Sequence, residues 1–350
     1  MKKLFKNRFL RLGLFMLAIF VILNVPIPHY LVETPGGVIN LRPLVMVDGK
    51  EDMQKGSFYL TAVASKKLSL QRLIHAKFFS DFEVIQKEKE VLQGMKSEEY
   101  WRMLKYVLDS SENLAIDQAA KLAGIPTTLN FKGVYVVNVE KKSNFYGKLS
   151  IGDKITNIDD KFFDSSKEIV DYVRSQKIGK SVKLAFERGN QKIEVSGKLI
   201  QMDKSKTPGI GVGISDYTTI ETKIPIKINA GEVGGPSGGL MFTLQIYQML
   251  SGKDLRHGKA IAGTGTMEKD GSVGRIGGID KKVAAANASG VEIFFTPDDK
   301  ILPEWKKKDP TLVSNYKEAK RAAKKLGTKM KIVPVKKIKD AVNYLENLKS

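Results

Sequence analysis

The chain has 350 residues, a formal net charge of +20, 42% hydrophobic residues and no cysteine. The length predicts two domains, and the lack of cysteine excludes disulfides, thiol chemistry and cysteine-based metal sites. The positive charge favours anionic surfaces such as membrane headgroups. Because no recognition helix, aromatic RNA-binding strand or zinc-ligand spacing accompanies that charge, we expect no nucleic-acid partner.

A basic segment precedes a long apolar one at the N-terminus. Residues 1–11 carry five lysines and arginines, and residues 12–32 contain no Asp, Glu, Lys or Arg. A spanning helix needs about 20 apolar residues, and a basic flank favours a cytoplasmic N-terminus. We therefore expect residues 1–32 to form a single-pass anchor in the cell membrane, with the rest of the chain outside the cell. A cleaved signal peptide is the alternative, although no small-x-small cleavage site follows.

Residues 33–124 show strand patterns and then helical ones, without visible chemistry. Strands are predicted over 38–41 and 57–63. Helices are predicted over 70–79, 100–108 and 114–123, the last ended by a Gly-Ile-Pro sequence.

The pattern changes after residue 125. A glycine-led strand over 133–139 is followed by a Gly-Asp turn, a helix over 165–174 with a Ser165/Glu168 capping box, and a hairpin over 181–197. This order resembles a PDZ domain of the bacterial protease type, here residues 125–203. PDZ domains bind extended peptides by adding a strand to a sheet edge. The resemblance places the peptide beside that helix, along Gly133, Val134, Tyr135 and Val136. A structural module without a ligand is the alternative.

A glycine-lined turn, Gly234-Gly-Pro-Ser-Gly-Gly239, separates a predicted strand over 223–229 from a predicted apolar helix over 240–250. Glycines allow close backbone approach, and free N–H groups at a helix start can hold a developing oxyanion. Ser237 is therefore placed like a nucleophile. The alternative is that Ser237 only caps the helix.

A second candidate segment begins at Gly277. At 100° per residue, Ile279, Lys282, Val283 and Ala286 share one helical face, and Lys281 falls on the opposite, solvated face. A lysine buried on an apolar face loses its charge, and the neutral amine can then act as a general base. The alternative is that Lys282 extends its amine to the surface.

These segments together resemble the proteolytic domain of Lon-type serine proteases. The resemblance makes Ser237 the nucleophile and Lys282 the base, with Thr264 supporting the lysine and Gly238 contributing an oxyanion N–H group. The sequence departs from the usual pattern at Gly234, where Asp is common, and at Gly238, where Ala is common. The segments that carry the resemblance are Pro236-Ser-Gly238, Gly263-Thr-Gly265 and Gly277-Gly-Ile-Asp-Lys-Lys282.

Other catalytic arrangements have less support in the sequence. A Ser-His-Asp triad would need His29, His75 or His257, of which the first lies at the expected membrane boundary and the last in a polar loop. Ser314-x-x-Lys317 fits a penicillin-binding-protein motif, but the companion Lys-Thr-Gly is missing. No P-loop sequence occurs, so we expect an ATP-independent enzyme without cofactor or metal.

We therefore expect an α+β protein with an anchor (1–32), a strand and helix region packed on the protease (33–124), a PDZ domain (125–203) and a Lon-like Ser-Lys protease domain (204–350). The whole resembles PDZ-containing Lon-like proteases of Gram-positive bacteria, specifically the streptococcal branch that processes secreted peptide pheromones. Lon-type domains often form hexamers, so the question of whether this chain forms a homo-oligomer stays open. The alternatives are a membrane-tethered PDZ adaptor and a general extracytoplasmic quality-control protease.

Overall fold

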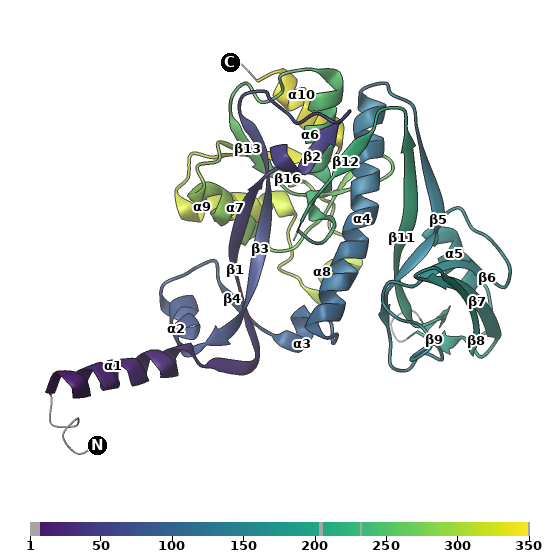
Figure 1. Cartoon of the computed structure of the whole chain (residues 1–350), viewed down its shortest axis with the longest axis horizontal. Helices are drawn as coiled ribbons and strands as arrows, with labels where there is room; N and C mark the ends of the chain where they lie inside the picture. The colour runs from purple at the N-terminus through teal and green to yellow at the C-terminus, as the bar shows by residue number, and fades with distance from the viewer. Residues whose placement is uncertain (1–7, 203–205, 232, 349–350) are drawn as a thin grey trace.

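A computed structural model describes residues 8–202, 206–231 and 233–348 of the chain. Figure 1 shows a larger body made of the N-terminal and C-terminal parts of the chain, and a smaller sheet on the other side of one long helix. That helix is α4 (Ser97–Leu122), and a first helix, α1 (Arg8–Asn24), projects away from the larger body.

The sheet of the larger body joins two distant parts of the chain. Its strand order is β17-β16-β13-β3-β1-β4, and β3 runs antiparallel to β1 but parallel to β13, with Phe58 opposite Ile261. One hydrophobic core contains Phe58 and Leu60 together with Leu240 and Phe242. Residues before and after the smaller sheet thus fold as one unit. The strands are β1 (Pro26–Asn40), β3 (Ser57–Ser69), β4 (Val84–Lys87), β13 (Ala260–Gly263), β16 (Ile293–Pro297) and β17 (Lys331–Val335).

A buried ion pair links the same two parts. Arg256 is fully buried and donates to the Asp52 carboxylate, which also accepts a 2.9 Å hydrogen bond from Gln245. Burial opposes ionisation of Asp52, but the hydrogen bonds from Arg256 and Gln245 hold its pKa below the ordinary value.

The expected apolar helix ends earlier than predicted. α1 stops at Asn24, and Pro26 begins β1, where residues 31–33 pair with both β3 and β4. Proline disfavours helix at the preceding residue, which explains the early end. Within residues 8–202, 206–231 and 233–348, no helix has both the length and the apolar character needed to cross a bilayer.

The two helices predicted over 100–108 and 114–123 are one helix, α4. Its middle contains buried polar side chains, among them Ser110 and Ser111, which interrupt the apolar periodicity. The helix packs on the larger body through one face and on the smaller sheet through another.

The remaining elements of the larger body are β2 (Val45–Val47), α2 (Leu70–Phe78), α3 (Glu88–Val91), β12 (Ile226–Ile228), α6 (Gly239–Ser251), β14 (Thr266–Met267), β15 (Val273–Gly274), α7 (Ile279–Ala288), α8 (Pro303–Lys308), α9 (Asn315–Leu326) and α10 (Ile338–Glu346).

The smaller sheet has the order β11-β5-β6-β7-β8 and its own apolar core, which includes Phe145, Leu184 and Phe186. The predicted capping box of its helix is confirmed in part. Ser165 is the N-cap and its Oγ accepts from the Glu168 N–H at 3.2 Å, but the Glu168 carboxylate accepts at 3.0 Å from the N–H of Asp164, one residue before the cap. The elements are β5 (Thr127–Val139), β6 (Lys154–Ile158), α5 (Ser166–Arg174), β7 (Ser181–Arg188), β8 (Gln191–Lys198), β9 (Ile200–Gln201), β10 (Pro208–Gly209) and β11 (Val212–Thr222).

Candidate active site

Ser237 lies in a short 3-10 turn, η3 (Pro236–Gly238), which leads directly into α6. Gly235 precedes the turn with φ 86°, a conformation that favours glycine. The Ser237 carbonyl accepts hydrogen bonds from the Gly265 N–H at 2.8 Å and from Thr264 Oγ1 at 3.0 Å. Ser237 is not the helix cap, since the N-cap of α6 is Gly238. The strand predicted before this loop is limited to β12.

Lys282 reaches Ser237 from α7. Its Nζ lies 2.9 Å from Ser237 Oγ and 3.0 Å from Thr264 Oγ1, and the residue is only 4% exposed. The expected alternative, an amine extended into solvent, is therefore wrong. Burial disfavours the charged form and lowers the pKa of Lys282 to about 8.

The direction of the hydrogen bonds orients the lysine. The Thr264 hydroxyl donates its proton to the Ser237 carbonyl, so its oxygen accepts from an N–H of Lys282. A neutral amine has one lone pair. With an N–H committed to Thr264, that lone pair is available to accept the Ser237 hydroxyl proton.

The environment of Lys281 differs from the prediction. The residue is 5% exposed rather than solvated, and its Nζ lies 3.4 Å from Asp280 and 3.8 Å from Glu33. Glu33 belongs to β1, which packs against α7. The face opposite Lys282 is therefore covered by a strand that the helical periodicity alone could not reveal.

The two departures from the Lon pattern have local explanations. A β-carbon on Gly238 would lie 3.1 Å from both Leu60 and Phe242, so these two side chains leave little room for it. A β-carbon on Gly234 would lie 3.1 Å from the β-carbon of Leu104. In both places a neighbouring apolar side chain fills the space that a larger residue would need.

Sequence reasoning missed the contribution of α4. The Leu104 carbonyl accepts from the Gly235 N–H at 3.0 Å, and Ser111 Oγ donates to the Pro236 carbonyl at 3.1 Å. α4 thus holds the loop through hydrogen bonds at Gly235 and Pro236. No motif marks these residues, which lie in a stretch that shows no visible chemistry in its sequence.

The predicted peptide-binding residues do not lie on a free strand edge. Val134 pairs with Asp216 of β11 and with Ile155 of β6, and Tyr135 is likewise paired on both sides. Gly133, Val134, Tyr135 and Val136 are therefore inside the sheet, contrary to prediction, because β11 returns from beyond residue 211 to cover β5. The Tyr135 hydroxyl donates to Asp109 of α4 at 2.9 Å, and burial together with the Asp109 charge raises the pKa of Tyr135.

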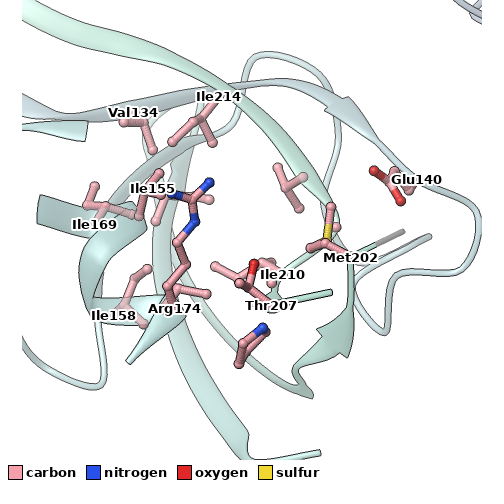
Figure 2. Close-up of a pocket in the computed structure, with 16 residues that line it drawn as sticks. Val134, Glu140, Ile155, Ile158, Ile169, Arg174, Met202, Thr207, Ile210 and Ile214 are labelled. Atoms are coloured by element: carbon pink, nitrogen blue, oxygen red, sulfur yellow. The ribbon is translucent and has the colours of Figure 1, made fainter. Parts of the chain in front are cut away.

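An apolar cavity of about 420 Å³ lies instead between α5 and the edge strand β11 (Figure 2). Figure 2 shows Arg174 of α5 extending its guanidinium among the apolar side chains. The cavity is separate from Ser237, and its apolar lining includes Val134, Ile155, Ile169, Val173, Ile210 and Ile214.

The alternative catalytic residues have other partners. His257 Nε2 lies 3.2 Å from the Leu345 carbonyl, and His75 pairs with Glu83 at 3.1 Å. His29 lies in β1. Ser314 caps α9, so the Ser-x-x-Lys spacing has a structural explanation.

Comparison with known proteins matches residues 119–199 to the PDZ domain and residues 181–346 to the Lon protease (S16) C-terminal proteolytic domain. The chain therefore carries a PDZ domain and a Lon-type proteolytic domain. The two matches overlap at 181–199, where β7 and β8 belong physically to the PDZ sheet.

Several Lon proteases are similar to part of this chain. That of Metamycoplasma arthritidis is 36% identical over 104 residues, which are 28% of this chain and 12% of the relative. That of Aster yellows witches'-broom phytoplasma is 22% identical over 175 residues, which are 47% of this chain and 20% of the relative. The chain thus spans a small fraction of these relatives.

A solved PDZ domain also matches. The PDZ domain of the SdrC-like protein from Listeria innocua is 44% identical, covers 24% of this chain and 96% of its own, and has a TM-score of 0.24.

Proposed function

We propose that this Lon-like peptidase is an ATP-independent endopeptidase that uses Ser237 and Lys282 as a catalytic dyad. The observation that carries the proposal is the 2.9 Å contact between Lys282 Nζ and Ser237 Oγ, made by a buried amine whose pKa is about 8. The pair meets the geometric requirement for a base and the nucleophile that it activates.

The reaction is acyl transfer in two steps. Neutral Lys282 takes the hydroxyl proton as Ser237 Oγ attacks the peptide carbonyl carbon, and the N–H groups of Ser237 and Gly238 stabilise the resulting oxyanion. The tetrahedral intermediate collapses, the C–N bond breaks, and protonated Lys282 gives its proton to the leaving amine. Water then attacks the ester carbonyl, with Lys282 again accepting a proton. The ester C–O bond breaks as Lys282 returns that proton to Ser237 Oγ, which releases the new carboxyl terminus. Thr264 holds the amine in position throughout.

Mass spectrometry of peptide digests tests the dyad directly. The wild-type chain should cut a panel of short peptides, and Ser237→Ala and Lys282→Met should lose this activity. Ser314→Ala is a matched control, since Ser314 caps α9 and should not affect cleavage. Full activity in Ser237→Ala would overturn the assignment.

The proposed substrate is an extended secreted peptide, and we include a signalling pheromone within that class. The support is the apolar cavity beside the β11 edge, where a peptide could add as a strand. One defined cut in few peptides would support dedicated processing. Many cuts would favour the general quality-control protease, and peptide binding without any cut would favour the adaptor.

We also propose that the chain is attached to a membrane through α1, with its catalytic part outside the cell. The support is that α1 contains no buried residue, and that neighbouring α2 also buries none and is followed by exposed Phe79. Flotation with anionic vesicles tests attachment: the full chain should float, and Phe15→Ser/Phe20→Ser should float less. A wild-type chain that stays with the soluble fraction would contradict the proposal.

A further inference from the structure

A large aromatic side chain lies exposed beside the catalytic loop. Trp101, in the N-terminal half of α4, is 54% exposed. Tryptophan contributes a large apolar area, and proteins place it at a surface mainly where something binds. Its position on the helix that holds the Ser237 loop therefore calls for a functional explanation.

Trp101 lies against the loop three residues before the nucleophile. Its Cζ3 atom is 3.6 Å from the position that a β-carbon on Gly234 would occupy. Leu104, one helical turn further along α4, has its Cβ 3.1 Å from the same position and its Cδ2 3.6 Å from the corresponding position on Gly235. Together these two side chains form an apolar wall along the Gly234–Gly235 backbone.

Gly234 exposes this wall. A glycine places no side chain between the indole and the space in front of the loop. The Leu104 carbonyl also accepts the Gly235 N–H at 3.0 Å, so the wall and the loop are held in a fixed relation. A peptide that reaches Ser237 across this loop would bring one of its side chains against Trp101.

We propose that Trp101 and Leu104 form a substrate subsite that binds a bulky apolar side chain adjacent to the scissile bond. The inference rests on the proposed function of Ser237, and it adds a specificity to that function. Burial of an apolar side chain against the indole removes the apolar surface of both from water. A subsite of this kind discriminates between large and small apolar residues by roughly 10- to 100-fold.

Kinetics on matched peptides tests the subsite. The peptides differ at a single position beside the cleaved bond, with Leu or Phe in one series and Ala or Ser in the other. The wild type should prefer the bulky series in kcat/KM by about 10-fold or more, and Trp101→Ala should remove most of that preference. Trp101→Phe should restore much of it. Trp305→Ala, a change of the second tryptophan on α8, should leave the preference unchanged. An unaltered preference in Trp101→Ala would overturn the proposal.

A binding measurement separates this proposal from the proposed chemistry. In Ser237→Ala/Trp305→Phe the only indole is Trp101, because the chain has two tryptophans. Peptides of the bulky series should change its fluorescence, and the small series should not. Failure of the subsite would show as no response to either series, whereas failure of the catalytic assignment would show as cleavage by Ser237→Ala. A fluorescence change with lipid vesicles but not with peptides would mean that Trp101 contacts a membrane, and would also overturn the proposal.

Discussion

Lys282 combines burial with the absence of a countercharge. No ion pair to its amine is formed within the described residues, and its hydrogen bonds go to the hydroxyls of Ser237 and Thr264. Desolvation is the cause of its lowered pKa. The same burial that makes the amine a usable base at neutral pH therefore also makes its protonated form unfavourable in the folded protein.

The activity should consequently rise with pH. Only the neutral amine can accept the Ser237 proton, so kcat/KM should increase through a pKa of about 8 and level off above it. The measurement is the pH profile of kcat/KM on a peptide without titratable side chains. A flat profile between pH 6 and 10 would contradict the role of Lys282.

Replacement of the base should stabilise the fold. The folded pKa lies below the unfolded value, so the unfolded chain binds more protons between the two values, and stability rises with pH across that range. At neutral pH the buried amine should cost on the order of 3 kcal/mol. Lys282→Met should therefore raise the unfolding free energy at pH 7, with a gain that shrinks towards pH 10. A loss of stability in urea unfolding at pH 7 would count against this account.

Thr264 should affect turnover more than substrate binding. Thr264→Val keeps the shape of the side chain but removes the hydroxyl that accepts from Lys282 and donates to the Ser237 carbonyl. We expect kcat to fall by about 10- to 100-fold with KM nearly unchanged, since base positioning acts on the chemical step. Thr264→Ser should recover most of the rate. A change in KM alone would argue for a purely structural role.

At the scale of single residues, most of the candidate site could be predicted from the sequence. The Pro-Ser-Gly, Gly-Thr-Gly and Gly-Gly-Ile-Asp-Lys-Lys segments predicted Ser237, Thr264 and Lys282, which the structure brings together. Helical periodicity placed Lys282 on the apolar face correctly. It misplaced Lys281, because burial of the opposite face depends on β1, which lies far away in the sequence.

At the scale of elements, the predictions failed where they depended on which strands or helices lie next to each other. The strand over 133–139 was predicted as the peptide-binding edge, but both of its sides are occupied, and the edge belongs to β11. Local patterns identify a strand without identifying its neighbours. α4 was divided in two for a related reason: it packs against two bodies, so its buried residues do not follow a single face.

The groove beside β11 leads to a prediction about Arg174. The guanidinium lies among apolar side chains of the cavity and makes no ion pair with the described residues (Figure 2). It should bind a peptide carboxylate, with a charge-assisted hydrogen bond contributing about 1.5–3 kcal/mol. Arg174→Gln should weaken binding of a peptide with a free C-terminus by roughly 10-fold or more, and an amidated peptide should bind both forms alike.

Isothermal titration with the two peptides measures this difference. Lys177→Gln is the matched control, because Lys177 is exposed just beyond α5 and does not line the cavity. If an acidic side chain rather than the C-terminus supplies the carboxylate, the amidated acidic peptide should depend on Arg174 as well. If Arg174→Gln bound the free-C-terminus peptide and the acidic peptide as tightly as the wild type does, a carboxylate contact would be excluded.

At the scale of the whole molecule, the Asp52–Arg256 pair holds together the segments on either side of the PDZ domain. Arg256→Met should leave the Asp52 carboxylate buried without its cation and cost about 3–5 kcal/mol. The double variant Asp52→Leu/Arg256→Met should recover part of this loss, since it leaves no buried charge. Urea unfolding of both variants measures the difference. Equal stability of the single variant and the wild type would contradict the account.

The parallel pairing of β3 with β13 also determines how the chain can fold during synthesis. The Thr61 hydroxyl of β3 donates a hydrogen bond to the carbonyl of Gly263, which lies 202 positions later in the chain. The PDZ sheet closes within residues 127–222, so it can form while β3 still lacks its second neighbour. Domains generally fold as units, earliest segments first. Here β1 and β3 are synthesised first, but the pairing of β3 is among the last to be completed. Until residue 263 has been synthesised, the backbone N–H and C=O groups on one side of β3 are unpaired and can pair with a strand of another chain.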